Sequence, residues 1–346
     1  MDLNVRVDVP VLTKLVDYFA SGIGSVAGSM MATWRARREA EATRIAAQGD
    51  ADTQRILAEG QSDALQVVAK ATADARELLS SQFTTTQGQL SVGEMVTQRI
   101  QFQEEKRQVN LLSVLNKATE ELGDGVVTDH EPDHDWTARF FNDVQDVSSE
   151  EMQTLWAKIL AGEVQRPGST SIRTLSILRN LDKETATLFE RFCSACVSLQ
   201  PDKRVFIDAR VPSLGGRPGE NALQKYGLSY DLLNVLNEHG LIISDYNSWF
   251  DYRICIGFSV PESQVARIPF SYQGRYWILV STSQRDADTE FRLSGVALTR
   301  SGRELSRVVD IQSMEEYTQD LKAFFESKSL RMVEVPNGQP ILTPKI

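Results

Sequence analysis

The sequence predicts an α+β protein with a long N-terminal helical arm, a central three-helix unit and a C-terminal winged-helix-like α+β body. Three observations predict this class. Residues 1–122 carry helical periodicity, residues 148–199 contain three short amphipathic helices joined by turns, and residues 200–346 mix helices with strands rich in β-branched and aromatic residues. A chain of 346 residues is long enough for about two domains.

Composition restricts the classes of function and location. The net charge is −10, so nucleic-acid binding is not expected, because such proteins need a basic face to displace the counterions of phosphate. Only three cysteines occur, and we find neither a secretory signal nor an apolar run of 18 residues. We therefore expect a cytoplasmic protein, with peripheral contact at the inner membrane as an alternative.

The first expected element is an amphipathic helix over residues 11–34. Its apolar residues alternate in steps of four and three, the spacing of a coiled-coil seam. This oligomer or membrane face consists of Leu12, Val16, Phe19, Ile23, Val26 and Met30, followed by Arg35, Arg37 and Arg38. The stripe favours self-association, whereas the small residues opposite it and the arginines favour an anionic membrane surface. We expect a homo-oligomer, keep the membrane surface as an alternative, and leave any other protein partner unknown.

An Ala-rich helical stalk is expected over residues 39–79, and a further helix over residues 92–122. The apolar face predicted for the end of that helix consists of Val109, Leu112, Leu115, Ala118 and Leu122. Residues 123–147 form an acidic linker with seven acidic residues against one arginine. Within this linker, Trp136, Phe140, Phe141 and Val144 predict a short helix that docks through its apolar side.

The body begins with the helical unit. Ser148 and Glu151 have the spacing of a capping box, and the helix that follows carries a stripe through Trp156. A second helix is expected around Leu175, and a third after Asp182.

The remaining part of the body is predicted to be winged-helix-like. We expect a helix over Ser229–His239, strands over Tyr252–Val260, Arg275–Thr282 and Phe291–Leu298, and then two helices and a last strand. The helix over Ser229–His239 carries no Lys or Arg, so it fits contact with protein better than major-groove reading.

Several runs of residues resemble a known family. They are the run from Ser148 to Glu163, Arg166-Pro-Gly-Ser169, Ser171-Ile-Arg-Thr-Leu175, Leu181-Asp-Lys-Glu-Thr-Ala186 and Leu298-Thr-Arg-Ser-Gly-Arg-Glu-Leu305. Over about residues 135–310 the chain is similar to the bacterial domain-of-unknown-function family 2806, and more distantly to abortive-infection proteins. The resemblance implies a bacterial or phage-associated protein with a role in phage conflict, and it brings no catalytic residues.

Two groups of residues suggest ligand binding. Arg166, Ser169, Ser171 and Arg173 surround the start of a helix, where guanidinium, hydroxyl and backbone N–H groups suit an anion. The alternative is helix capping with ion pairs to nearby acids. His130 and His134 lie in an acidic string and are weak candidates for metal ligands, because Pro132 breaks helical spacing and a solvated linker explains the string.

Cys193 and Cys196 form a single C-x-x-C pair on an apolar stripe, which favours buried packing over metal or redox chemistry. No nucleophile motif occurs, and we expect no catalytic residue and no cofactor. The sequence favours a non-enzymatic interaction, scaffold or sensor protein. The alternatives are a metal-dependent enzyme that uses His130 and His134, and a winged-helix nucleic-acid regulator.

Overall fold

The computed structural model of the protein describes residues 92–123, 132–200, 206–257, 266–283, 289–336 and 341–342. The chain divides into two units, Met1–Leu112 and Ser113–Ile346. The residues proposed from the sequence as an oligomer or membrane face, Leu12 to Arg38, lie outside the described residues, as does His130.

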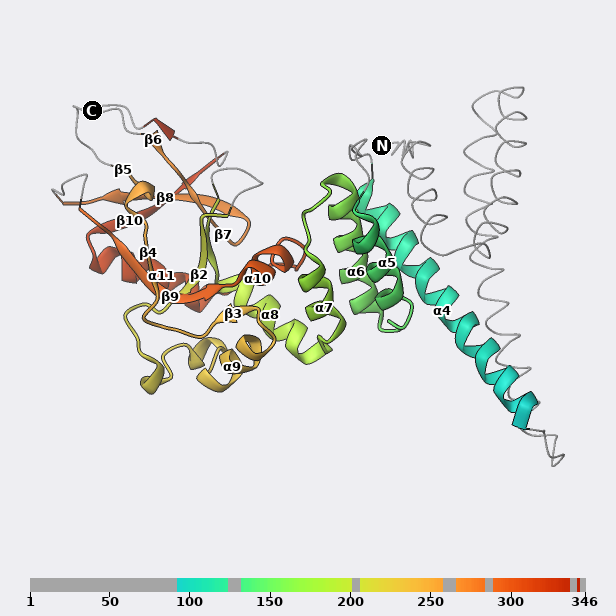
Figure 1. Cartoon of the computed structure of the whole chain (residues 1–346). Helices are drawn as coiled ribbons and strands as arrows, with labels where there is room; N and C mark the ends of the chain where they lie inside the picture. The colour runs from blue at the N-terminus through green and yellow to red at the C-terminus, as the bar shows by residue number, and fades with distance from the viewer. Residues whose placement is uncertain are drawn as a thin grey trace, which may run out of the picture. The chain divides into compact units, whose positions relative to one another are not determined.

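Five helices come first among the described residues (Figure 1). They are α4 (Val92–Leu122), α5 (His134–Val144), α6 (Glu150–Gln165), α7 (Ile172–Arg179) and α8 (Lys183–Ala195). Side-chain caps fix where three of them begin: Asp133 accepts a hydrogen bond from Trp136, Ser171 from Thr174, and Asp182 from Thr185. The cap of α6 is Ser149, so the prediction of Ser148 is wrong by one residue; Ser149 Oγ also donates to Glu151 at 2.7 Å.

The short helix α5 docks as its sequence predicts. Its aromatic residues Trp136 and Phe140 are buried, and the Phe140 ring meets the Trp156 ring of α6 edge-on at 5.3 Å. Trp156 is fully buried, which confirms that α6 supplies core.

The apolar face of α4 differs from the prediction. The buried residues of its last turns are Leu111, Val114, Ala118 and Leu122. Val109 and Leu112, which belong to the apolar face predicted from the sequence, are 43% and 42% exposed. The sequence offers apolar residues on both sides of this helix, and periodicity alone does not decide which side packs.

Strands and further helices follow α8. They are β1 (Val197–Leu199), β2 (Asp208–Pro212), α9 (Tyr230–Glu238), β3 (Ile242–Ile243), β4 (Trp249–Asp251), β5 (Ile256–Gly257), β6 (Ala266–Arg267), β7 (Phe270–Tyr272), β8 (Arg275–Ser281), β9 (Arg292–Leu298), α10 (Arg300–Leu305), α11 (Glu315–Ser327), β10 (Leu330–Val335) and β11 (Ile341–Leu342). Short 3₁₀ turns lie at Pro218–Glu220, Gln224–Tyr226 and Arg253–Cys255.

Among the described residues, nine strands form one sheet with the order β10-β8-β7-β1-β2-β9-β3; β4 pairs with β9 and β5 with β8. All of its pairs are antiparallel except β5 with β8, and β11 pairs with β6 separately. Helix α11 packs against β10, and its Tyr317 and Phe325 are fully buried. The α+β class is thus confirmed.

The part predicted to be winged-helix-like is more elaborate than a simple winged helix. β3, which follows α9, pairs directly with β9, which precedes α10, but five strands, β4 to β8, lie between them in the sequence. The predicted strand Tyr252–Val260 is wrong over Arg253–Cys255, where the Asp251 carboxylate accepts a hydrogen bond from the Arg253 N–H at 3.0 Å and the chain makes a 3₁₀ turn.

Candidate functional site

A cleft of about 360 Å³ lies in the second unit where α6, the loop after it and α10 come together. Its walls come from distant parts of the sequence: Lys158 and Arg166 from the α6 side, Ser169 from the loop, and Glu304 and Arg307 from the α10 side. Helix α10 also contacts α7, and Figure 1 shows the two helices side by side.

The buried carboxylate of Glu163 holds the loop between α6 and α7 in place. It accepts hydrogen bonds from the Gly168 N–H at 2.5 Å, the Ser169 hydroxyl at 3.0 Å and the Thr170 N–H at 2.9 Å. Burial raises the pKa of Glu163 above its ordinary value, and these hydrogen bonds offset part of that effect. The loop donors are therefore directed at a protein carboxylate.

A second buried carboxylate, Glu304 of α10, lies at the start of α7. It accepts hydrogen bonds from the Ser171 N–H at 2.7 Å and the Thr174 hydroxyl at 2.6 Å, and Arg300 donates to its other oxygen at 2.9 Å. Burial raises the pKa of Glu304, but these three partners outweigh burial and hold the pKa below its ordinary value. The carboxylate of Glu304 thus lies at the N-terminus of α7, where the partial positive charge of the helix end favours an anion. The chain itself supplies this anion.

The low pKa of Glu304 predicts a pH effect on stability. A carboxyl group whose pKa is lower when folded stabilises the protein above its unfolded pKa, about 4.3, and loses that contribution as the pH falls through the folded pKa. We expect Glu304→Gln to reduce the free energy of unfolding by about 1–3 kcal/mol at pH 7, and by progressively less below about pH 4.3. Urea unfolding between pH 7 and 3 measures this difference. A difference in the free energy of unfolding that stays the same at every pH would contradict the prediction.

Two arginine residues line the same cleft. Arg166 is exposed at the end of α6, and Arg307 is half-buried after α10, with its guanidinium 5.0 Å from the centre of the Phe206 ring. Burial lowers the pKa of Arg307, and the nearby charge of Arg166 lowers it further.

The comparison with family models gives a match to a protein of unknown function, DUF2806, over residues 94–322. The chain belongs to the DUF2806 family. No curated protein and no solved structure matches it. Two of the runs that carried the resemblance, the run from Ser148 to Glu163 and Leu298–Leu305, contribute Glu163 and Glu304 to this site in the DUF2806 chain.

The four residues predicted from the sequence to bind an anion do not all lie at one site in the DUF2806 chain. Arg166 and Ser169 line the cleft, whereas Ser171 caps α7 and bonds Glu304. The Arg173 guanidinium is directed toward Gly240, and a Cβ added to that glycine would lie 3.6 Å from it. Anion binding by these residues stays a prediction. Sequence reasoning missed Arg307 and Glu304, because no spacing signal relates residues so distant in the chain.

His134 is the first residue of α5. Over the ranges that the structure describes, no group of three or more His, Cys, Asp or Glu side chains could hold a metal ion. Within the same ranges, no helix is both long and apolar enough to cross a bilayer.

All three cysteines are free and buried. Burial raises the pKa of the Cys193 thiol well above its ordinary value and that of Cys196 to about 12. Neither sulfur has the thiolate character that redox or metal chemistry requires, which agrees with the packing role predicted from the apolar stripe.

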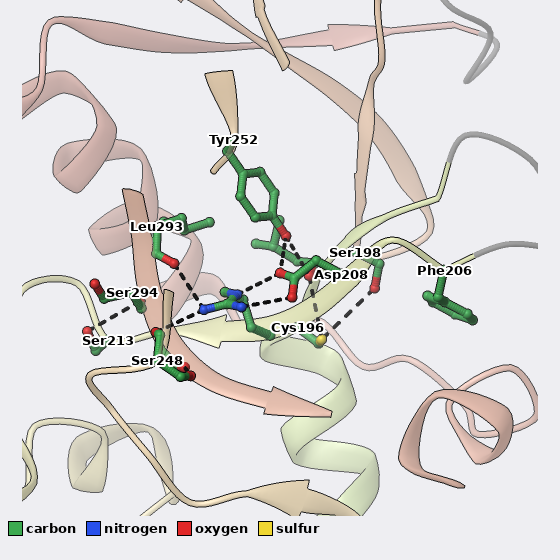
Figure 2. Close-up of polar contacts among 12 residues, drawn as sticks. Cys196, Ser198, Phe206, Asp208, Ser213, Ser248, Tyr252, Leu293 and Ser294 are labelled. Carbon is green, nitrogen blue, oxygen red and sulfur yellow. Dashed lines mark hydrogen bonds and ion pairs between the residues drawn. The ribbon is translucent and has the colours of Figure 1, made fainter. Parts of the chain in front are cut away.

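A buried polar network lies in the sheet, at β2 (Figure 2). Arg210 donates to both carboxylate oxygens of Asp208, at 2.6 and 2.8 Å, and to the carbonyl oxygens of Ser248 and Leu293, at 2.9 and 3.1 Å. The Tyr252 hydroxyl donates to Asp208 at 3.0 Å. The charged and polar groups of the network are hydrogen-bonded to one another. The network therefore joins β2 to β9 and to the segment before β4, and it has a structural role.

Proposed function

We propose that this protein is a non-enzymatic interaction protein that self-associates through helix α4 and uses its α+β body as a sensor or scaffold. The observation that carries the proposal is the exposed apolar side of α4. Six large apolar residues of this helix are exposed: Met95, Val96, Ile100, Phe102, Val109 and Leu112. Contiguous exposed apolar surface of this kind marks interaction sites.

Four of these residues form one stripe, which we call the outer stripe and define as Met95, Phe102, Val109 and Leu112. The first three follow one another at intervals of seven residues, and each interval turns a straight helix by only about 20°. At about 100° per residue, Val109 lies roughly opposite Ala118, which is fully buried. The outer stripe is thus distinct from the side of α4 that packs.

The charges beside the outer stripe favour a second copy of the same helix as its partner. Glu94 lies on one flank of the stripe, and Arg99 and Lys106 lie on the other, whereas Glu105, seven residues before Leu112, lies within the stripe. In a parallel pair of helices the acidic flank of one copy faces the basic flank of its partner, whereas an antiparallel pair places like charges together. The pattern of charges therefore fits parallel pairing. A surface that carries both acidic and basic side chains fits an anionic membrane less well.

The seam predicted for Leu12 to Met30 would extend this association along the arm. Contact of that segment with a membrane surface, a cytoplasmic location and a role in phage conflict stay predictions from the sequence and the resemblance. A winged-helix nucleic-acid regulator and a metal enzyme that uses His130 and His134 stay alternatives without a supporting observation.

The test replaces two residues of the outer stripe. We expect Phe102→Asp with Val109→Asp to weaken self-association by at least about 100-fold, because charged groups would be buried without partners in the pair. Sedimentation velocity of the full-length protein measures the change: the wild type is expected at twice 38.7 kDa or a higher multiple, and the variant at 38.7 kDa.

The matched control puts the same charges on α4 away from the outer stripe, at the exposed residues Thr97 and Gln103. Thr97→Asp with Gln103→Asp is expected to keep the wild-type mass. A wild type that is monomeric, or a stripe variant with wild-type mass, would contradict the proposal.

A further inference from the structure

Two exposed apolar residues of α4, Val96 and Ile100, do not belong to the outer stripe. They are 40% and 51% exposed. Val96 precedes the fully buried Val114 by eighteen residues, and Ile100 precedes the fully buried Ala118 by the same interval. At about 100° per residue this interval is about five turns, so each exposed residue lies on the same side of the helix as its buried counterpart. The packing side of α4 thus continues toward its N-terminus as an exposed apolar surface, which we call the inner surface and define as Val96 and Ile100.

The inner surface lies in the part of α4 that belongs to the first unit of the chain. The boundary between the two units falls inside the helix, after Leu112. Asn110 is the first residue along α4 to be buried, and the helix before it is about 27 Å long at about 1.5 Å per residue. A cover for this length of helix is therefore favoured from the same unit, among the residues that precede α4.

Residues 64–79, which precede the described part of the chain, have the sequence of a helix that fits this surface. Their charged residues Asp63, Lys70 and Glu77 follow one another at intervals of seven, which places them on one side of a helix. The apolar residues fall on the other side: Leu65, Val68, Ala71, Ala75, Leu78 and Leu79. Alanine favours the helix and lets a neighbouring backbone approach closely. Such a helix would be about 24 Å long, close to the length of α4 that it would cover.

The connection between this segment and α4 favours the chain's own segment over a second copy. Residues 80–91 are rich in serine and threonine and contain Gly88, a composition typical of a turn. A short connection brings the two helices together as antiparallel neighbours. It also holds them at an effective concentration in the millimolar range, which a separate chain does not reach at ordinary protein concentrations.

We propose that residues 64–79 fold back along the inner surface of α4 and form an antiparallel helical hairpin with it. Val68, Ala71 and Ala75 then face Ile100 and Val96 across the hairpin. The outer stripe lies roughly opposite the inner surface and stays open for a second copy. The hairpin is independent of self-association, because its contacts lie within one chain.

Disulfide formation in the full-length protein tests the hairpin. Ile100→Cys is combined with Ala71→Cys in one protein and with Ala75→Cys in a second, so that the test does not depend on one register. The matched control is Ile100→Cys with Ala73→Cys, because Ala73 lies on the charged side of the same segment. The three native cysteines are buried and are not expected to react. Intact mass after oxidation and alkylation under native conditions counts the free thiols and separates single chains from dimers.

We expect at least one of the two test proteins to lose both introduced thiols at the mass of a single chain. Its rate should be independent of protein concentration and at least about 10-fold higher than that of the Ala73 control, because a disulfide requires Cα atoms within about 7 Å. The proposal is overturned if neither test protein forms this disulfide, if the Ala73 control forms it equally fast, or if Ile100→Cys instead links two chains. The last result would assign the inner surface to a second copy.

Discussion

Replacing Asp208 with asparagine is expected to lower the free energy of unfolding by about 3–5 kcal/mol. Arg210 is only 3% exposed, and two of its four hydrogen bonds go to the two oxygens of Asp208. With asparagine, the buried guanidinium group keeps the two carbonyl oxygens and at most one amide oxygen as acceptors, and it loses its negatively charged partner. The Tyr252 hydroxyl also loses its charged acceptor.

Urea unfolding at pH 7, followed by circular dichroism, measures this loss. The matched control is Glu334→Gln, which removes an exposed ion pair to Arg275 at 3.2 Å and is expected to change stability by less than about 1 kcal/mol. Equal midpoints for the two variants would show that the Asp208–Arg210 pair does not hold the sheet together.

Trp156→Ala is expected to lower the free energy of unfolding by about 3–5 kcal/mol. Trp156 is fully buried in α6 and packs edge-on against Phe140, whose ring stacks with Trp136 at 5.2 Å. Truncation would leave a large cavity beside the Phe140 ring, and the helices around it could fill that cavity only in part.

Two further tryptophan variants serve as controls in the same unfolding experiment. Trp249 is 44% exposed and stacks with Arg292 at 4.1 Å, so Trp249→Ala is expected to change stability by about 1 kcal/mol or less. The indole N–H of Trp156 has no hydrogen-bond partner among the described residues, so Trp156→Phe should be milder than Trp156→Ala. A Trp156→Ala protein as stable as the Trp249→Ala protein would contradict the assignment of α6 to the core.

Much of the helical part could be predicted from local signals. Asp182 begins α8 because its carboxylate caps that helix, and the aromatic residues of α5 mark its buried face. Strand β8 could also be predicted, because its seven residues include several β-branched and aromatic side chains, and β9 lies within the strand predicted over Phe291–Leu298.

The sheet order and the cleft could not be predicted. β1 has three residues and β5 has two, so neither leaves a periodic pattern, and β2 pairs with β9 across more than eighty residues of sequence. The anion site was predicted from one local segment, whereas the cleft is lined by residues as distant in the chain as Arg166 and Arg307. Only folding brings those two residues together.

A disulfide cross-link tests the central claim, parallel self-association through α4, most directly. Cys193, Cys196 and Cys255 are buried, so a cysteine introduced by Met95→Cys on the outer stripe is expected to be the one that reacts under mild oxidation. In a parallel pair residue 95 faces its own copy, and we expect the full-length Met95→Cys protein to form a dimer of twice its mass on non-reducing gels. A Met95→Cys protein that stays monomeric after oxidation, or that cross-links only when mixed with the Val109→Cys protein, would contradict the account.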